Sequence, residues 1–218
     1  MINATRLWSI APLHVVKQAL RPPPIFQIGF NKCGTTSLHR FLLDSGIASV
    51  HWQRGELARR IMARIDAGQD PIRDFPTKIG FTDMIDLQPG ALLEPYKRFE
   101  YLHSWYPGAL FILNTRDREG WVASRAAHAF EHDRLVSRYA ECLAIPEDQV
   151  SAFWRSEWDV HHTLARAYFG NSPNFLEFDI ERDDPDTLRE FVARTYPQCR
   201  QTPFGLHNPS DASTVACG

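Results

Sequence analysis

Residues 25–38 read Ile-Phe-Gln-Ile-Gly-Phe-Asn-Lys-Cys-Gly-Thr-Thr-Ser-Leu, and this stretch decides the fold. An apolar run stops at Gly29, and apolar residues then recur at helical spacing from Ser37 until Gly46. The pattern predicts a strand, a glycine loop and a helix. In that context a loop can wrap an anion with its backbone N–H groups, because they lie at the positive end of the helix dipole.

The loop from Gly29 to Thr36 has the spacing of the nucleotide triphosphatase loop, G-x-x-x-x-G-K-[ST], with one change. Thr35 stands where those proteins place a lysine, and the only lysine of the loop, Lys32, lies three residues earlier. An isolated glycine pair is more often a turn without a ligand. The strand, the helix and the lysine together favour anion binding.

The amino-acid composition excludes several classes of protein. The chain has 218 residues, of which 44% are hydrophobic and 23% charged, a balance typical of a globular protein rather than a disordered or fibrous one. The formal net charge is −2, so the protein as a whole does not attract polyanions and we expect no nucleic-acid partner. An anionic ligand would have to be bound by cations clustered at its own site. The cysteines are far apart and predict neither a zinc knuckle nor a disulfide framework, which favours a reducing compartment.

No apolar run approaches the roughly 18 residues of a membrane span, so we expect none. Residues 7–16 faintly resemble a secretory leader, but Pro12 and His14 interrupt them and no small-x-small cleavage site follows. We therefore predict a surface arm or a short helix for these residues, and a cytoplasmic location for the protein. The oligomeric state cannot be derived from these patterns.

Strands and helices alternate along the rest of the chain. Beyond the strand at 25–29, apolar runs predict strands at 78–82, 109–114 and 174–179, and a short strand ending near His51. Helical spacing predicts helices at 56–67, 92–102, 118–140 and 146–169, and a last one marked by Leu188, Phe191 and Val192. Such alternation implies an α/β fold with three layers, in which helices cover both faces of a central parallel sheet. We predict an N-terminal arm at 1–24, one domain at 25–202 and a tail at 203–218.

A second polar segment follows the strand that ends at Asn114. Arg116 can offer a planar fork to phosphate oxygens, Ser124 lies eight positions later as a neutral donor, and Asp117 is placed to cap the helix. An Arg-Asp pair before a helix is by itself more often a cap and a solvated charge. The presence of both polar segments, in order and at strand ends, favours a shared anion site instead.

The two segments resemble those of the sulfotransferases. Residues 30–38 look like the 5′-phosphosulfate loop of that family, and Arg116 with Ser124 is similar to its 3′-phosphate element. The family transfers a sulfuryl group from 3′-phosphoadenosine 5′-phosphosulfate to an acceptor hydroxyl or amine, on a fold related to the P-loop nucleoside triphosphate hydrolases and kinases. Adenosine 3′,5′-bisphosphate is then the product.

The resemblance implies a role for each residue of the loop. Lys32 would contact the phosphosulfate bridge during an in-line displacement. The residues after it would line the donor pocket through backbone and hydroxyl donors: Cys33, Gly34, Thr35, Thr36 and Ser37. Because the donor carries roughly four negative charges, clustered cations are needed at the carboxyl edge of the sheet, and we expect Lys32, Arg116 and Arg125 to supply them.

The resemblance also directs the search for a catalytic base. Cytosolic sulfotransferases end the second core strand with a Thr-His pair whose histidine is the base, and here Thr82-Asp83 stands at the matching place. Asp83 is the first candidate, although a carboxylate is a weak base near neutrality unless burial raises its pKa. A helix cap ahead of Met84 is nearly as well supported. His51 is the reserve base, although a histidine beside a tryptophan is more often a packed side chain.

No metal is expected. His128 and His132 are four residues apart within the predicted helix at 118–140, but no third ligand accompanies them. His161 and His162 are adjacent in a helix, so their side chains point in different directions, and we interpret them as packing and surface residues.

Two other functions remain open. One is an ATP-dependent P-loop small-molecule kinase with Asp179 organising magnesium, although the missing lysine at position 35 counts against it. The other is a non-catalytic module that binds an adenine nucleotide, which would share Lys32, Arg116 and Ser124. The acceptor of a sulfotransferase could be a small molecule such as an alcohol, a carbohydrate, a lipid or a peptide tyrosine, and the sequence does not distinguish them.

Overall fold

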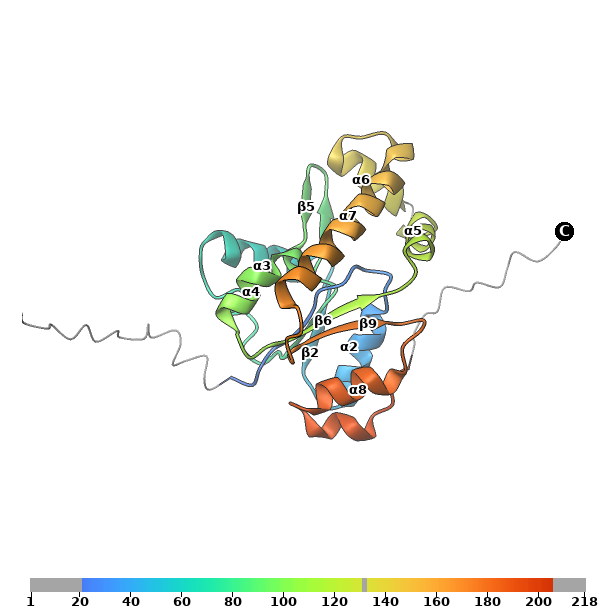
Figure 1. The fold of residues 1–218 in the computed structure, drawn as a ribbon. Helices are drawn as coiled ribbons and strands as arrows, with labels where there is room; N and C mark the ends of the chain where they lie inside the picture. Colours follow the sequence, from blue (N-terminus) through green and yellow to red (C-terminus); the bar gives the residue numbers. More distant parts are fainter. Residues whose placement is uncertain (1–20, 131–132, 206–218) are drawn as a thin grey trace, which may run out of the picture.

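Five parallel strands form the central sheet, in the order β2-β3-β1-β6-β9 (Figure 1). The computed structural model describes residues 21–130 and 133–205. The strands are β1 (Ile25–Gln27), β2 (Ser49–His51), β3 (Gly80–Thr82), β6 (Leu110–Thr115) and β9 (Phe175–Asp179). Each lies where an apolar run predicted it, and the predicted parallel pairing is confirmed for all of them.

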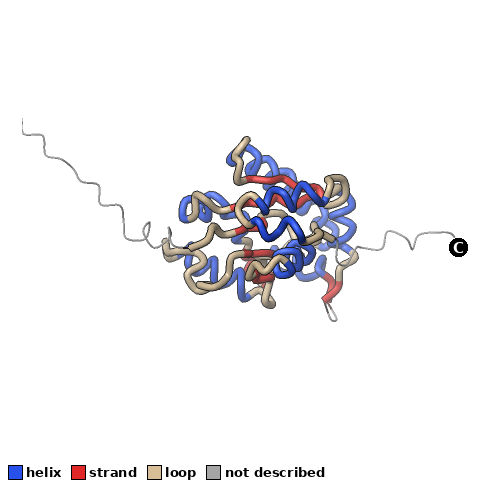
Figure 2. The backbone as a smooth tube through the Cα atoms, turned by 90° about the horizontal axis from the view of Figure 1, so that it is seen from below, coloured by secondary structure: helices blue, strands red, loops and turns tan. Residues whose placement is uncertain are grey.

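Helices cover both faces of this sheet, which confirms the predicted three-layer α/β fold (Figure 1), and Figure 2 shows the strands among these helices from below. One face is covered by α2 (Thr35–Asp44) and α8 (Pro185–Ala193), whose apolar residues pack with those of the strands in one core cluster. The other face packs in a second cluster against α3 (Glu56–Asp66), α4 (Phe99–Trp105), α5 (Arg118–Ala126), α6 (Leu135–Leu143) and α7 (Glu147–Phe169). Within the described part of the chain, no helix is long and apolar enough to cross a membrane.

The strand β6 shows why these residues form the middle of the sheet. All of its side chains are buried, because Phe111 and Leu113 face the α7 side while Leu110 and Ile112 face the α2 side. A strand covered on both faces can be apolar throughout, as its sequence indicated.

The predicted helix at 92–102 is wrong at its beginning. Leu92 and Leu93 lie in β5 (Ala91–Leu93), which pairs antiparallel with β4 (Asp86–Gln88). A 3₁₀ turn, η1 (Pro95–Arg98), follows, and α4 begins only at Phe99. Pro95 has no N–H to donate to an earlier turn, so it starts the new element instead of continuing a helix.

The single helix predicted at 118–140 is also wrong. The structure has α5, then the short strands β7 (Ala129–Phe130) and β8 (Asp133–Arg134), then α6. No glycine or proline stands between Gly120 and Pro146 to signal the break. His128 therefore lies beyond the end of α5, while His132 falls outside the described residues.

The register of the sheet brings the strand ends to a common edge. Pairing joins His51 to Thr82 and Thr115 to Asp179 at the last residues of their strands. The segments that follow these strands and β1 therefore emerge on the same side of the molecule. Open parallel sheets bind ligands at this carboxyl edge.

The glycine loop after β1 is attached to the sheet through the side chain of Asn114, which is 2% exposed. Its Oδ1 accepts hydrogen bonds from Gly29 N (3.1 Å) and Gln27 Nε2 (2.6 Å), and its Nδ2 donates to the carbonyl of Cys33 (2.6 Å). A Cβ at position 29 would lie 2.1 Å from the carbonyl oxygen of Asn114, so only glycine permits this approach. Asn114 thus holds both ends of the loop.

The Asn114→Ala variant should therefore lose about 2–4 kcal/mol of unfolding free energy, because buried backbone groups of the loop lose their partner. Urea denaturation measures this loss. Asn171→Ala, at an exposed turn, is the matched control and should change stability by no more than about 0.5 kcal/mol. Equal stability of the two variants would contradict the anchoring role.

Candidate active site

The loop between β1 and α2 presents backbone donors to the carboxyl edge. Lys32 and Gly34 have φ angles of 64° and 78°, in the left-handed region. Gly34 is the N-cap residue of α2 and has no side chain to bond the first turn, so the first N–H groups of the helix remain available to an anion. A Cβ on Gly34 would lie 3.2 Å from Ile180, which leaves no room for a side chain beside this cradle.

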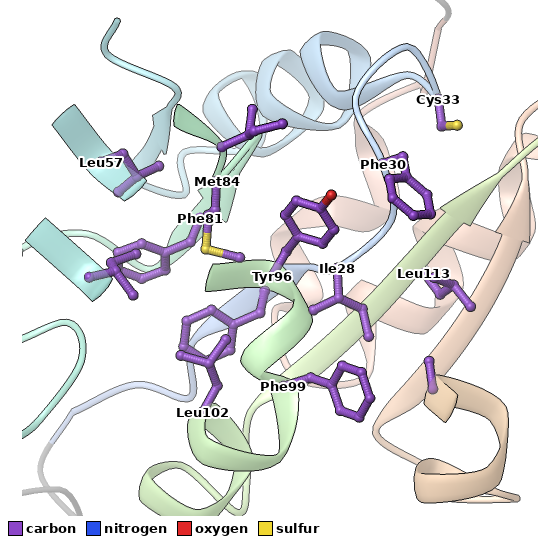
Figure 3. Packing of buried hydrophobic residues seen from close by; sticks show 14 of the residues in the cluster. Ile28, Phe30, Cys33, Leu57, Phe81, Met84, Tyr96, Phe99, Leu102 and Leu113 are labelled. Carbon is purple, nitrogen blue, oxygen red and sulfur yellow. The ribbon is translucent and has the colours of Figure 1, made fainter. Parts of the chain in front are cut away.

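The side chains of the loop do not all face the cradle. Cys33 packs in the core near Phe30 (Figure 3), and burial raises the pKa of its thiol well above the ordinary range. Cys33 can therefore serve a ligand only through its backbone. Thr35 and Ser37 are buried as well, whereas Thr36 is half-buried.

The amine of Lys32 lies 3.3 Å from Nδ1 of His128. Burial lowers the pKa of Lys32, while the charge of Asp83 acts in the opposite direction. The pKa of His128 is also lowered, by burial and then by the charge of Lys32, so this imidazole is neutral near pH 7 and accepts a hydrogen bond from the lysine. The sequence suggested His128 only as a possible metal ligand, whereas in the structure it is the hydrogen-bond partner of the Lys32 amine.

Arg116 lies on the same side of the molecule as Lys32. Its Nη1 donates to the carbonyl oxygen of Lys32 (3.4 Å), and its Nη2 forms an ion pair with Glu181. The Nε atom of Arg116 is buried without a partner in the described part of the chain. A Cβ added to Gly120 on α5 would lie 3.7 Å from Arg116 Nη2. Ser124 is half-buried one helical turn after Gly120, so it lies on the same face of α5. Asp117 caps α5 as expected, because its Oδ2 accepts from Gly120 N (2.7 Å).

Arg125, expected among the cations at the carboxyl edge, is instead enclosed in the core. Its side chain is 1% exposed, and its guanidinium carbon lies 4.5–4.7 Å from the ring centroids of Trp121, Tyr139 and Trp154. Such cation–π contacts hold α5 against α6 and α7. Arg125 acts on the site through its positive charge. This charge lowers the pKa of Asp83, whereas burial, the larger effect, raises it.

Asp83 occupies the position directly after β3, with a φ of 54° and its N–H donated to Gln27 Oε1 (2.7 Å). No helix begins there, so the interpretation of Asp83 as a helix cap is wrong. Burial raises the pKa of Asp83 to about 6, against the charges of Arg125 and Lys32. Its Oδ1 is buried without a partner among the described residues, and its Oδ2 lies 3.7 Å from His51 Nε2.

His51 is placed to act on Asp83. Its Nδ1 lies 3.0 Å from Thr82 Oγ1, and that hydroxyl donates its own proton to the carbonyl of Val50 (3.2 Å). The hydrogen-bond pattern therefore assigns the proton of the ring to Nδ1, so that Nε2 presents a lone pair to Asp83. Burial lowers the pKa of His51 to about 4, which leaves the ring neutral at pH 7.

The carboxylate of Asp179 closes a turn of its own chain. Its Oδ1 accepts from Glu181 N (2.9 Å), and its Oδ2 lies 3.9 Å from Arg182 Nε.

Among residues 21–130 and 133–205, no group of three or more histidine, cysteine, aspartate or glutamate side chains could hold a metal ion. Both histidines at 161–162 are buried against aromatic rings, so their interpretation as packing residues is confirmed and the expected surface position is wrong.

Sequence reasoning missed four residues that shape this edge: Gln27, Asn114, His128 and Glu181. A signal was present for the first two, because each is a polar residue near the end of an apolar strand. His128 and Glu181 had no such signal. Their contacts depend on how α5 ends and how the turn after β9 folds.

Comparison with protein families agrees with this arrangement of loop, arginine and sheet edge. A family model described as a sulfotransferase domain matches residues 24–203, a range that contains β1, both polar segments and β9. The chain therefore belongs to the sulfotransferase domain family. It is a transferase enzyme that moves sulfuryl groups. No curated protein sequence matches the chain.

Proposed function

We propose that the enzyme transfers the sulfuryl group of 3′-phosphoadenosine 5′-phosphosulfate to an acceptor hydroxyl or amine. The observation that carries this proposal is the contact between Arg116 Nη1 and the Lys32 carbonyl, because it joins the two predicted donor segments at one edge of the sheet. The donor supplies an activated sulfuryl group. Transfer breaks its S–O bond to the phosphate, forms a bond from sulfur to the acceptor, and leaves adenosine 3′,5′-bisphosphate.

The residues of the edge fit this donor. Backbone N–H groups from Gly34 to Ser37 surround its 5′-phosphosulfate, while Arg116 and Ser124 are placed for the 3′-phosphate. Support comes from Arg116 Nε, a buried donor atom without a partner among the described residues. Lys32 holds its positive charge where negative charge develops on the leaving phosphate, which is the main contribution that a protein can make to a loose transition state.

Asp83 is our proposed base. With a pKa of about 6 its carboxylate is ionised at pH 7, yet it accepts a proton more readily than an ordinary aspartate does. The proton of the acceptor moves to Asp83, and the neutral Nε2 of His51 then stabilises the protonated acid by accepting its hydrogen bond. His51 is the reserve base if Asp83 only orients the acceptor.

We propose a small molecule or a carbohydrate as the acceptor, and the cytoplasm as the location. The described cysteines, Cys33, Cys142 and Cys199, are free thiols, which agrees with a reducing compartment. No metal takes part in this proposal. The match to the sulfotransferase family counts against the kinase and the non-catalytic binding module, and the following experiments test both directly.

Calorimetric titration of the purified protein with adenosine 3′,5′-bisphosphate, and then with ATP and magnesium, tests the donor. We expect the bisphosphate to bind at least about tenfold more tightly, because Arg116 and Ser124 match a 3′-phosphate and position 35 lacks the lysine that bridges a triphosphate. A preference for ATP would indicate the kinase instead. Bisphosphate binding without any sulfuryl transfer to a panel of alcohols, sugars and amines would indicate the binding module.

Lys32→Ala should lower turnover about 100-fold, because the charge on the leaving phosphate loses its partner. Its unfolding free energy should change by less than about 1 kcal/mol, since the residue is half-buried on a loop. Lys78→Ala, which precedes β3 at the opposite edge of the sheet, is the control and should leave turnover unchanged. Parallel losses of stability and turnover in Lys32→Ala would make this lysine structural.

Asp83→Asn should lower turnover about 100-fold while the bisphosphate affinity changes less than about twofold, because the base acts on the acceptor and not on the nucleotide. In the wild type, kcat/KM should rise with pH through about 6 as the carboxylate of the free enzyme loses its proton, and this rise should vanish in the variant. Asp66→Asn, exposed at the end of α3, is the matched control. Unchanged turnover would return the role of base to His51 or to solvent.

A further inference from the structure

The guanidinium of Arg116 is engaged by a carboxylate of its own chain. One oxygen of Glu181 pairs with Arg116 Nη2, and the other accepts the backbone N–H of Asp117 (3.0 Å) at the N-terminus of α5. A guanidinium and a helix N-terminal N–H form the pair of donors that a phosphate group receives. The carboxylate of Glu181 therefore occupies Arg116, which our proposed function gives to the 3′-phosphate, together with the neighbouring N–H of Asp117.

We propose that Glu181 is an internal substitute for the 3′-phosphate and sets how tightly the site binds 3′-phosphorylated nucleotides. The inference rests on the proposed function, since it takes Arg116 as the ligand of that phosphate. Glu181 must leave Arg116 before a 3′-phosphate can take its place. It is a specificity-determining residue, not a catalytic one.

The turn after β9 places Glu181 beside Arg116 and the N-terminus of α5. Asp179 accepts the N–H of Glu181 through Oδ1 (2.9 Å), and Asp179 N donates to Asp183 Oδ2 (2.8 Å). The N–H of Ile180 donates to the carbonyl of Thr115 (3.0 Å), which ties the turn to the end of β6 directly before Arg116. The turn that carries Glu181 is thus held by three hydrogen bonds, one of them from the backbone N–H of Glu181 itself, so that only the side chain of Glu181 needs to move.

The same turn touches the glycine loop. A Cβ on Gly34 would lie 3.2 Å from Ile180 Cγ2, so the residue before Glu181 packs against the cradle of the 5′-phosphosulfate. One short segment therefore contacts both donor segments. The position of Glu181 is in this way coupled to the shape of the whole nucleotide site.

The exposure of the two partners makes the exchange feasible. The side chain of Glu181 is 36% exposed and can turn into solvent, whereas that of Arg116 is only 16% exposed and stays in place. A half-exposed ion pair is weak and can be displaced by a dianion that brings more acceptor oxygens. If Glu181 holds Arg116 for about nine tenths of the time, the apparent affinity for a 3′-phosphate falls about tenfold.

Calorimetry on the full-length chain tests this inference with two nucleotides, adenosine 3′,5′-bisphosphate and adenosine 5′-phosphate, which lacks the 3′-phosphate. We expect Glu181→Gln to bind the bisphosphate about five- to tenfold more tightly and the monophosphate within about twofold of the wild type. Glu177→Gln is the matched control, because it removes one negative charge from β9 where Glu177 pairs with Arg166. It should change neither affinity more than about twofold, and urea denaturation shows that both variants fold.

The outcomes separate the inference from the function on which it rests. If the wild type prefers the bisphosphate and Glu181→Gln binds it no better, the inference is wrong while the proposed function stands. If Glu177→Gln increased the affinity for the bisphosphate as much as Glu181→Gln does, the effect would come from the net charge alone, and the inference would also be wrong. A loss of monophosphate affinity in Glu181→Gln would assign the carboxylate to a ribose hydroxyl. If no variant prefers the bisphosphate to ATP, the donor assignment itself fails, and the inference fails with it.

Discussion

The site depends on one buried carboxamide, that of Asn114. Its three hydrogen bonds join β6 to the end of β1 and to the carbonyl of Cys33, so the loop that carries Lys32 is tied to the strand that directly precedes Arg116. Gly29 makes the close approach possible, since a side chain there would collide with Asn114. The two predicted anion-binding segments thereby become one rigid edge.

Burial is the common cause of the unusual titration behaviour at this edge. It lowers the pKa of Lys32 and His51 and raises that of Asp83, because each charged form loses its hydration. Backbone strain coincides with it: Lys32 and Asp83 have left-handed φ angles, as do residues 52–54 directly after β2. Strained residues gather where a protein positions reactive groups, and the surrounding contacts maintain them. The chemistry that we propose uses the same groups that the fold desolvates.

The failures of sequence reasoning share a physical reason. The break after α5 has no glycine or proline to signal it, although the chain leaves the helix there and enters the antiparallel pair of β7 and β8. Arg125 was expected among the donor's cations, yet three aromatic rings from α5, α6 and α7 enclose it. Neither outcome could be derived from spacing, since both depend on how α5, α6 and α7 pack together.

What the sequence determined by itself is the order of the five central strands and the position of two polar segments at strand ends that it predicts to bind an anion, because apolar periodicity and glycine placement act locally along the chain. It also identified Lys32, Arg116, Asp83 and His51 as candidates. Only the tertiary structure decided which of them meet: it placed His51 Nε2 beside Asp83, His128 beside Lys32 and Glu181 on Arg116. Those contacts join residues far apart in the chain, so the register of the parallel sheet and the packing of its connections had to form first.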